Sequence, residues 1–280
     1  MSKTKFFNGY LKEDLYMIQP EGFVDPKGDN KVCKLQQSIY GLVQTSRSWN
    51  IRFDSVIKAY GLIQTFGEAC IYKKVSGSSV AFLILYVDDI LLIGNDTEFL
   101  NSIKGYLNNN FSMKDLGEAA YILGIKIYRD RSTRLIGLSQ SIYLDKVLQK
   151  FKMDQAKKGF LPMLQGVKLS QTQCTTTAED REKMKVIPYA LAIGSIMYAM
   201  LCTRPDVCLA ISLAGRYQSN PGVDNWTMVK NILKYLKRTK DMFLVYGGDK
   251  ELVINGYVDA SFDTDPDDTK SQTGYIFFIK

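Results

Sequence analysis

Two adjacent carboxylates, Asp88 and Asp89, lie between two apolar stretches in the sequence VAFLILYVDDILLIG, which covers residues 80–94. These stretches predict a β-hairpin with both carboxylates at its tip. Because the apolar runs are continuous, we expect the hairpin to be buried on both faces. Adjacent buried carboxylates repel each other and lose hydration unless a cation neutralises them. The pattern therefore indicates a divalent-metal site or, as the simpler alternative, a water-exposed Asp-Asp turn.

The composition limits the chemistry that such a site can do. Histidine is absent from the 280 residues, which excludes Ser-His-Asp and Cys-His nucleophile pairs, His-ligated zinc and imidazole acid–base catalysis. Carboxylates alone can hold Mg²⁺, and paired metal ions assist phosphoryl transfer. Lys and Arg number 36 against 29 Asp and Glu, a formal charge of +7 with a pI near 9.0. This excess favours a polyanionic partner such as nucleic acid.

Two predicted helices flank the hairpin and would position its tip. Residues 44–60 repeat apolar side chains at helical spacing and stop at Gly61. After the hairpin, Asn95 and Asp96 can cap a second helix. The local order is therefore helix, hairpin, helix.

The rest of the chain predicts a second hairpin, several helices and a final group of strands. Residues 121–138 predict a hairpin with a basic turn, and Ser139 precedes a helix. Residues 160–181 are rich in Gln and Thr and predict a loop. Further helices are expected at 188–202, 205–217 and 226–239, and strands of one sheet are expected from residue 243 onward.

Targeting and redox signals are absent from the sequence. No apolar stretch reaches the ~20 residues that a membrane span needs, and the N-terminus has no signal-peptide pattern. Five irregularly spaced cysteines predict reduced thiols. We therefore expect no membrane partner. The sequence predicts no oligomeric state.

Several motifs, in order along the chain, resemble the reverse transcriptase of copia-type (pseudovirus) LTR retrotransposon Pol polyproteins. The motifs are NGYLKEDLYMIQPEGF (8–23), KLQQSIYGLVQTSRSWN (34–50), YVDDILLIGND (86–96), FSMKDLGEAAYILGIKI (111–127), SQSIYLDKVL (139–148), TRPDVCLAISLAGRYQSNPG (203–222) and VKNILKYLKRT (229–239). They span essentially the whole chain, so the resemblance is specific.

The resemblance implies an α+β fold, a fragment of a right-hand polymerase. It implies fingers, palm and thumb over residues 1–165, truncated at the N-terminus, and a helical connection over 166–242. The first strands of an RNase H-like sheet would follow over 243–280, truncated at the C-terminus. It also implies an RNA/DNA template–primer and deoxynucleoside triphosphates as partners, Mg²⁺ or Mn²⁺ as cofactor, and a cytoplasmic (virus-like particle) or nuclear location.

The resemblance also implies roles for individual residues. Asp88 and Asp89 match two catalytic, metal-binding carboxylates, and Tyr86 and Val87 lie beside the primer end. Phe6 matches a steric gate against the ribose 2′-hydroxyl. Gly41 and Gln44 match contacts to the incoming nucleotide and template.

One carboxylate of the family pattern is not found. Alignment on Asn8 and Gly9 places Met1 where the first catalytic aspartate stands in the family. A methionine cannot hold Mg²⁺ as a carboxylate does, so we expect two-metal nucleotidyl transfer to be absent or very weak in this chain. The alternative is a degenerate or co-opted nucleic-acid-binding remnant without catalysis.

Four cations are candidates for contact with a nucleic-acid backbone. Arg47 lies on the first helix, and Lys230, Lys234 and Lys237 form a stripe opposite apolar residues of the last helix. A solvated helix face is the alternative for each of them.

One further carboxylate, Asp259, resembles the first catalytic aspartate of RNase H. A single carboxylate cannot hold the metals of that site, so we expect Asp259 to be vestigial and RNase H activity to be absent. The acidic run that includes Asp263, Asp265, Asp267 and Asp268 is expected to be a solvated turn rather than a metal cage.

Overall fold

The computed structural model describes residues 13–26, 28, 31–39, 41–87, 89–164, 166, 169–247, 253–262 and 265–279. The chain forms two compact units, residues 1–119 and 120–280. The described residues contain seven α-helices and several β-sheets, so the mixed α and β composition expected from the sequence is confirmed. The three-part division of the chain into polymerase, connection and RNase H-like segments stays a prediction.

The first unit is built on a four-stranded antiparallel sheet with the strand order β3-β4-β5-β6. Its strands are β3 (Ile63–Thr65), β4 (Glu68–Ser76), β5 (Ser79–Tyr86) and β6 (Asp89–Gly94). Strands β5 and β6 are the hairpin that the sequence predicts. A separate small hairpin pairs β1 (Tyr16–Ile18) with β2 (Val32–Lys34).

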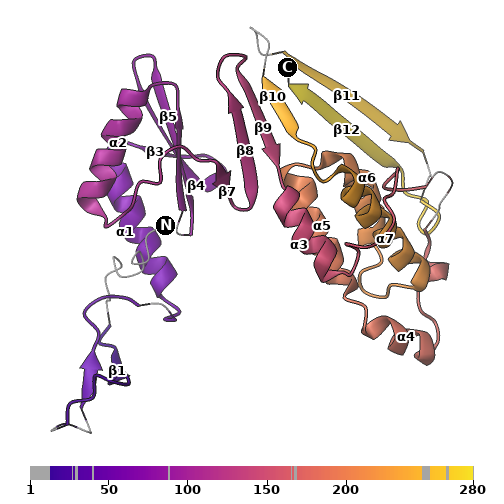
Figure 1. Ribbon diagram of the computed structural model, residues 1–280, viewed down its shortest axis with the longest axis horizontal. Helices are drawn as coiled ribbons and strands as arrows, with labels where there is room; N and C mark the ends of the chain where they lie inside the picture. The colour runs from indigo at the N-terminus through magenta and orange to yellow at the C-terminus, as the bar shows by residue number, and fades with distance from the viewer. Residues whose placement is uncertain are drawn as a thin grey trace. The chain divides into compact units, whose positions relative to one another are not determined.

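Two helices cover one face of this sheet (Figure 1). They are α1 (Thr45–Ala59) and α2 (Thr97–Asn110), which confirms both predicted helices within a few residues. The Asp96 carboxylate accepts hydrogen bonds from the backbone N–H groups of Glu98 and Phe99, so it is the N-cap of α2.

Aromatic packing closes the core of the first unit. Phe53 has no exposed surface and stacks on Phe111 with ring centroids 5.6 Å apart, while Trp49 meets Phe111 edge-on at 5.2 Å. The sheet contributes Tyr72, whose phenol donates a hydrogen bond to Asp54 on α1 at 2.9 Å. This packing holds the β5–β6 hairpin firmly against the two helices.

The second unit begins with a four-stranded sheet with the strand order β10-β9-β8-β7. Its strands are β7 (Tyr121–Ile122), β8 (Ile125–Asp130), β9 (Leu135–Ser139) and β10 (Leu244–Gly247). The sequence predicts that the strand at 244–247 belongs to the same sheet as the later strands. That assignment is wrong, because β10 pairs with β9 along its whole length.

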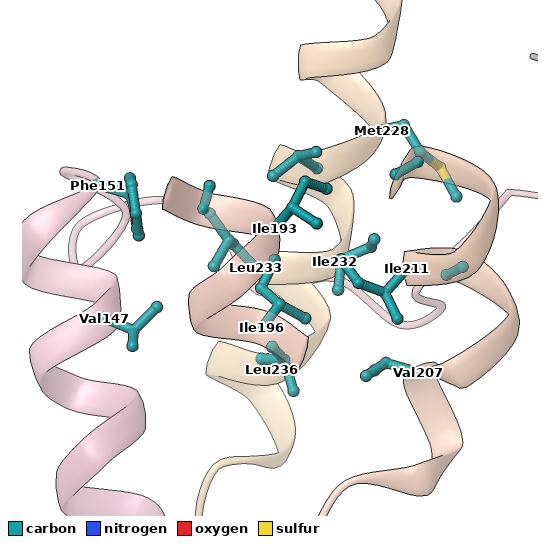
Figure 2. Close-up of a cluster of buried hydrophobic side chains, with 14 of the residues drawn as sticks. Val147, Phe151, Ile193, Ile196, Val207, Ile211, Met228, Ile232, Leu233 and Leu236 are labelled. Carbon is teal, nitrogen blue, oxygen red and sulfur yellow. The ribbon is translucent and has the colours of Figure 1, made fainter. Parts of the chain in front are cut away.

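A cluster of helices forms the core of the second unit. The helices are α3 (Ser141–Lys150), α4 (Ala178–Lys185), α5 (Tyr189–Cys202), α6 (Cys208–Gly215) and α7 (Val223–Thr239), with short 3₁₀ turns η2 (Gln171–Gln173) and η3 (Pro205–Val207). Figure 2 shows apolar side chains of α3, α5, α6 and α7 meeting in one cluster, with Ile193, Ile196, Ile232 and Leu233 fully buried.

In the second unit, the predictions are confirmed for helices α3 and α5, and the bounds of the other helices differ from those predicted. The predicted helix at 205–217 begins as the 3₁₀ turn η3, and α7 begins three residues before its predicted start. The expected loop at 160–181 contains η2 and the start of α4. Met184 is the one buried residue of α4, so this helix has no apolar stripe that the sequence could reveal.

An ion pair at the start of η3 is hydrogen-bonded to the end of α7. The Arg204 guanidinium donates from Nε to Asp206 Oδ1 at 3.0 Å and from Nη2 to Asp206 Oδ2 at 2.7 Å. It also donates to the Thr239 carbonyl at 3.3 Å, and Tyr235 donates to Asp206 at 2.7 Å. Arg204 is 4% exposed, so little water competes for its guanidinium, whereas the Asp206 side chain is 39% exposed. The hydrogen bonds to Thr239 and from Tyr235 connect η3 to α7.

The last element is a two-stranded antiparallel hairpin of β11 (Ile254–Ser261) and β12 (Gln272–Ile279). Nearly every residue of both strands is exposed. Among the residues that the structure describes, no single helix is long and apolar enough to cross a membrane; α4 and α5 pass that test only as a pair bent by 49°.

Candidate functional site

The carboxylate turn lies at the end of the β5–β6 hairpin. Tyr86 and Asp89 are directly opposite each other in the strand register, so the loop between them has two residues, Val87 and Asp88. Cross-strand partners share a face of the sheet, which places the Tyr86 and Asp89 side chains side by side. Asp89 is half-buried and Tyr86 is 53% exposed. The predicted position of the carboxylate at the hairpin tip is confirmed for Asp89.

Only one face of the hairpin is buried, which corrects the expectation from the sequence. Leu83 and Leu85 point toward α1 and α2 and are at most 5% exposed. On the other face, Phe82 is 37% exposed and its cross-strand partner Ile93 is 48% exposed. Asp89 lies on this open face together with Tyr86. The continuous apolar run concealed the alternation, because apolar residues occupy both faces.

The open face changes the electrostatic argument for a metal. Asp89 keeps access to water, so its charge does not require a cation for stability in the way that a buried charge would. The same access leaves its oxygens available to a ligand. Carboxylate oxygens are the donors that Mg²⁺ prefers, so the residue fits such an ion. Among the residues that the structure describes, no group of three Asp, Glu, His or Cys could hold a metal. Metal binding by Asp88 and Asp89 stays a prediction.

The backbone of the turn is strained at Val87. Its φ angle is 45°, in the left-handed region that β-branched residues rarely adopt. Two-residue hairpin loops favour positive φ, because the resulting twist matches that of the strands. The loop length therefore imposes this conformation on Val87, and its side chain is 58% exposed.

The residues predicted to contact nucleotide and template lie at the start of α1. Gly41 has φ 96°, and a Cβ there would meet no atom within 4 Å, so the glycine serves the backbone conformation rather than a close approach. Gln44 is the N-cap residue of α1, and its Nε2 donates to Glu13 Oε2 at 3.3 Å. Arg47 is exposed on the first turn of the helix. Their contacts with nucleotide stay predictions.

Two predicted site residues, Phe6 and Asp88, lie outside the described residues. The position of Met1, where the family has its first carboxylate, lies outside them as well.

One cation on the open face was not predicted from the sequence. Lys73 on β4 is opposite Phe82 on β5, and its Nζ lies 5.7 Å from the centre of the Phe82 ring. Tyr86 is four residues further along β5, so Lys73 and the carboxylate turn share one face about 13 Å apart. Residues 71–75 read Ile-Tyr-Lys-Lys-Val, without the apolar–polar alternation that could have revealed this strand.

The lysine stripe on α7 is partly used within the unit. Lys237 Nζ donates to the Ala156 carbonyl at 2.8 Å, and the Gly159 N–H donates to the Lys234 carbonyl at 2.9 Å. The segment before Phe160 therefore runs along this face of the helix. Lys230, Lys234 and Lys237 are half-buried. Their contact with a nucleic-acid backbone stays a prediction, as does the solvated alternative for Lys230 and Lys234.

The two acidic positions near the end of the chain differ in environment. Asp259 is exposed on β11, opposite Gly274. Asp265 is 6% exposed and forms an ion pair with Arg216, so the expectation of a fully solvated acidic turn is wrong for this residue. Asp263 lies outside the described residues.

Comparison with known proteins gives a consistent assignment. The family model for reverse transcriptase (RNA-dependent DNA polymerase) matches residues 2–165. The chain is 44% identical over 276 residues to the retrovirus-related Pol polyprotein from transposon TNT 1-94 of Nicotiana tabacum, covering 98% of this chain and 21% of that protein. It is 32% identical over 274 residues to the corresponding polyprotein from transposon RE2 of Arabidopsis thaliana, covering 98% and 18%.

A yeast relative is similar in extent to this chain. The putative transposon Ty5-1 protein of Saccharomyces cerevisiae is 28% identical over 276 residues, which are 99% of this chain and 87% of that protein. The chain spans about a fifth of the length of the two plant polyproteins. No solved structure matches the chain.

Proposed function

Because this chain belongs to the reverse transcriptase family, within the Pol polyproteins of copia-type retrotransposons, we propose that its β5–β6 turn is a nucleotidyl-transfer site. The observation that carries the proposal is the position of Asp89 beside Tyr86 on the open face of a hairpin within the matched residues 2–165. A site that receives a duplex end needs such an uncovered face.

Each residue of the site has a proposed role. Asp88 and Asp89 hold the divalent ions, Mg²⁺ or Mn²⁺, and Tyr86 lies beside the primer end. The ions, when bound, neutralise the phosphate charges and orient the reacting oxygens. Gly41 and Gln44 contact the incoming deoxynucleotide and the template. The substrates are a deoxynucleoside triphosphate and an RNA or DNA template with its primer.

We propose that the activity of this 280-residue chain is weak. The residue aligned with the first family carboxylate is Met1, whose thioether is a poor ligand for Mg²⁺. Loss of one metal ligand leaves the phosphate charge incompletely compensated. Binding of nucleic acid without catalysis, by a degenerate or co-opted remnant, is the second candidate, and the same residue favours it.

Primer extension on poly(rA)/oligo(dT) with Mg²⁺ or Mn²⁺ tests the proposal. The chain is compared with its Asp88→Asn/Asp89→Asn double variant and with a Met1→Asp variant that carries an added initiator methionine. We expect filter retention of the duplex by all three proteins, and faster extension by the Met1→Asp variant than by the unchanged chain.

The possible outcomes separate the two candidates. Extension that disappears in the double variant supports the transfer site. Extension equal in the chain and the double variant refutes it. Duplex binding with no extension by any variant favours the remnant, and absence of both binding and extension contradicts both candidates.

A further inference from the structure

The acidic turn between β11 and β12 contacts the helical part of the second unit. Asp265 forms an ion pair with Arg216, which follows α6. The side chain of Asp265 is 6% exposed, whereas that of Arg216 is 38% exposed. A carboxylate that loses almost all its water needs charged or N–H partners to compensate. Arg216 and the Asp267 N–H, at 2.9 Å from Asp265 Oδ1, provide them.

A second carboxylate of the turn makes two further contacts with the same surface. Asp267 Oδ1 accepts a hydrogen bond from the backbone N–H of Gln171 at 2.8 Å. This N–H lies at the start of η2, where helical donors lack an internal partner. Asp267 Oδ2 accepts from the Tyr217 hydroxyl at 3.0 Å. Burial, and the nearby Asp267 charge, raise the pKa of Tyr217 to about 12, so the hydroxyl remains a donor at neutral pH.

Hydrogen bonds within the turn stabilise the conformation that makes these contacts. The Asp265 N–H donates to the Lys270 carbonyl at 3.3 Å, and the Thr269 N–H donates to the Asp265 carbonyl at 3.1 Å. Asp268 pairs with Lys270 inside the turn. Asp268 therefore offers a control position, because the hydrogen bonds and the ion pair of its carboxylate are with Lys270, inside the turn.

The contact is polar rather than apolar. A cavity of about 570 Å³ lies where the turn meets the helices, and Ser219, Asn220 and Lys270 contribute to its lining. The residues of the two strands of the hairpin are exposed along almost their whole length. The described contacts of this hairpin with the bundle are thus concentrated at its turn.

We propose that Arg216, Tyr217 and the start of η2 form a docking site for an acidic turn, and that residues 265–267 of the same chain occupy it as a latch. The latch attaches the β11–β12 hairpin to the helical bundle. Because Asp259 is on β11, the latch also determines where that carboxylate stands relative to the bundle. This inference does not depend on polymerase activity.

Amide hydrogen exchange of the full chain, followed by mass spectrometry, tests the latch. The variants are Arg216→Gln, Asp265→Asn and their combination, with Asp268→Asn as the matched control. We expect each single latch variant to accelerate exchange about tenfold in peptides covering 171–174 and 265–270. Exchange in α5 and α7 should be unchanged, which shows that the bundle remains folded.

The double variant separates a direct contact from two unrelated effects. Coupled partners lose one shared interaction, so the combination should exchange about as fast as either single variant. If the acceleration of exchange in the double variant equals the product of the accelerations in the two single variants, the proposal is overturned. An unchanged exchange rate at 171–174 in the single variants, or an equal acceleration by Asp268→Asn, would overturn it too. Faster exchange at 265–270 that disappears when the protein concentration is raised would show that the turn docks on a second copy of the chain. That result would also overturn the proposal.

Discussion

Replacing Val87 with asparagine should stabilise the β5–β6 hairpin. The φ angle of Val87 is 45°, and a non-glycine residue in this region costs about 1–3 kcal/mol. Asparagine tolerates the left-handed conformation better than other non-glycine residues, because its short polar side chain can hydrogen-bond locally. The substitution should therefore recover most of the strain without adding the chain entropy that glycine brings.

The expected size of the effect follows from the exposure of the side chain. Val87 is 58% exposed, so asparagine forfeits less than half of the burial energy of a full valine, about 1 kcal/mol. Subtracting this loss from about 2 kcal/mol of relieved strain leaves a net gain of about 1 kcal/mol. The opening equilibrium of the hairpin should fall about fivefold.

Hydrogen exchange of the amides in β5 and β6 measures this opening directly, which suits a chain with two units better than a single melting temperature. Val75 is a matched control, because it is 55% exposed and lies in β4 without a positive φ. Val75→Asn should lower stability slightly, since asparagine is disfavoured in strands. An opening equilibrium of Val87→Asn equal to or higher than that of the unchanged chain would refute the strain argument.

Three other changes have defined outcomes. Lys73→Ala should weaken duplex binding and reduce its salt slope by about 0.9, one phosphate contact, as measured by fluorescence anisotropy over a salt series. Asp206→Asn should destabilise the second unit at neutral pH by about 1–2 kcal/mol. Burial raises the pKa of Asp206, but hydrogen bonds, above all from Arg204, have a larger effect and hold the pKa below its ordinary value of 3.8. The stabilisation by Asp206 is therefore present above pH 3.8 and is lost as the pH falls through the lower pKa of the folded state. Ile232→Ala removes a side chain with no exposed surface and should cost about 3 kcal/mol in urea unfolding followed by Trp226 fluorescence.

Each of these outcomes has a control. Lys114 is an exposed lysine of the first unit, and an equal effect of Lys114→Ala would contradict a specific role for Lys73. If the difference in unfolding free energy between the unchanged chain and Asp206→Asn stays constant down to the most acid pH measured, the lowered pKa of Asp206 is contradicted. Ile142 is 52% exposed, so a loss in Ile142→Ala as large as that in Ile232→Ala would contradict the packing argument.

Local patterns in the sequence were sufficient for the elements around the turn. Apolar spacing predicts α1, and Asp96 marks the start of α2 because a carboxylate there satisfies free N–H groups of the first turn. The two apolar runs around Asp88 and Asp89 predict β5 and β6. Helix α4 was missed because its sequence, AEDREKMK, has no apolar stripe.

Contacts between distant segments were not predictable from such patterns. An apolar residue such as Phe82 has the same local signal whether a helix covers it or not, so exposure of one hairpin face depends on where α1 and α2 pack. The pairing of β10 with β9 joins segments about 110 residues apart. The burial of Asp265 depends on Arg216, which is 49 residues away.

The sequence by itself determined the family, the carboxylate turn and most helices, because these depend on residue types at short and regular spacing. The tertiary structure decided which face of the turn is open, that Lys73 shares this face, and that Lys237 and Asp265 are used within the second unit. The physical reason is that burial and charge pairing depend on the neighbours that folding brings together, and these neighbours lie far apart in the chain.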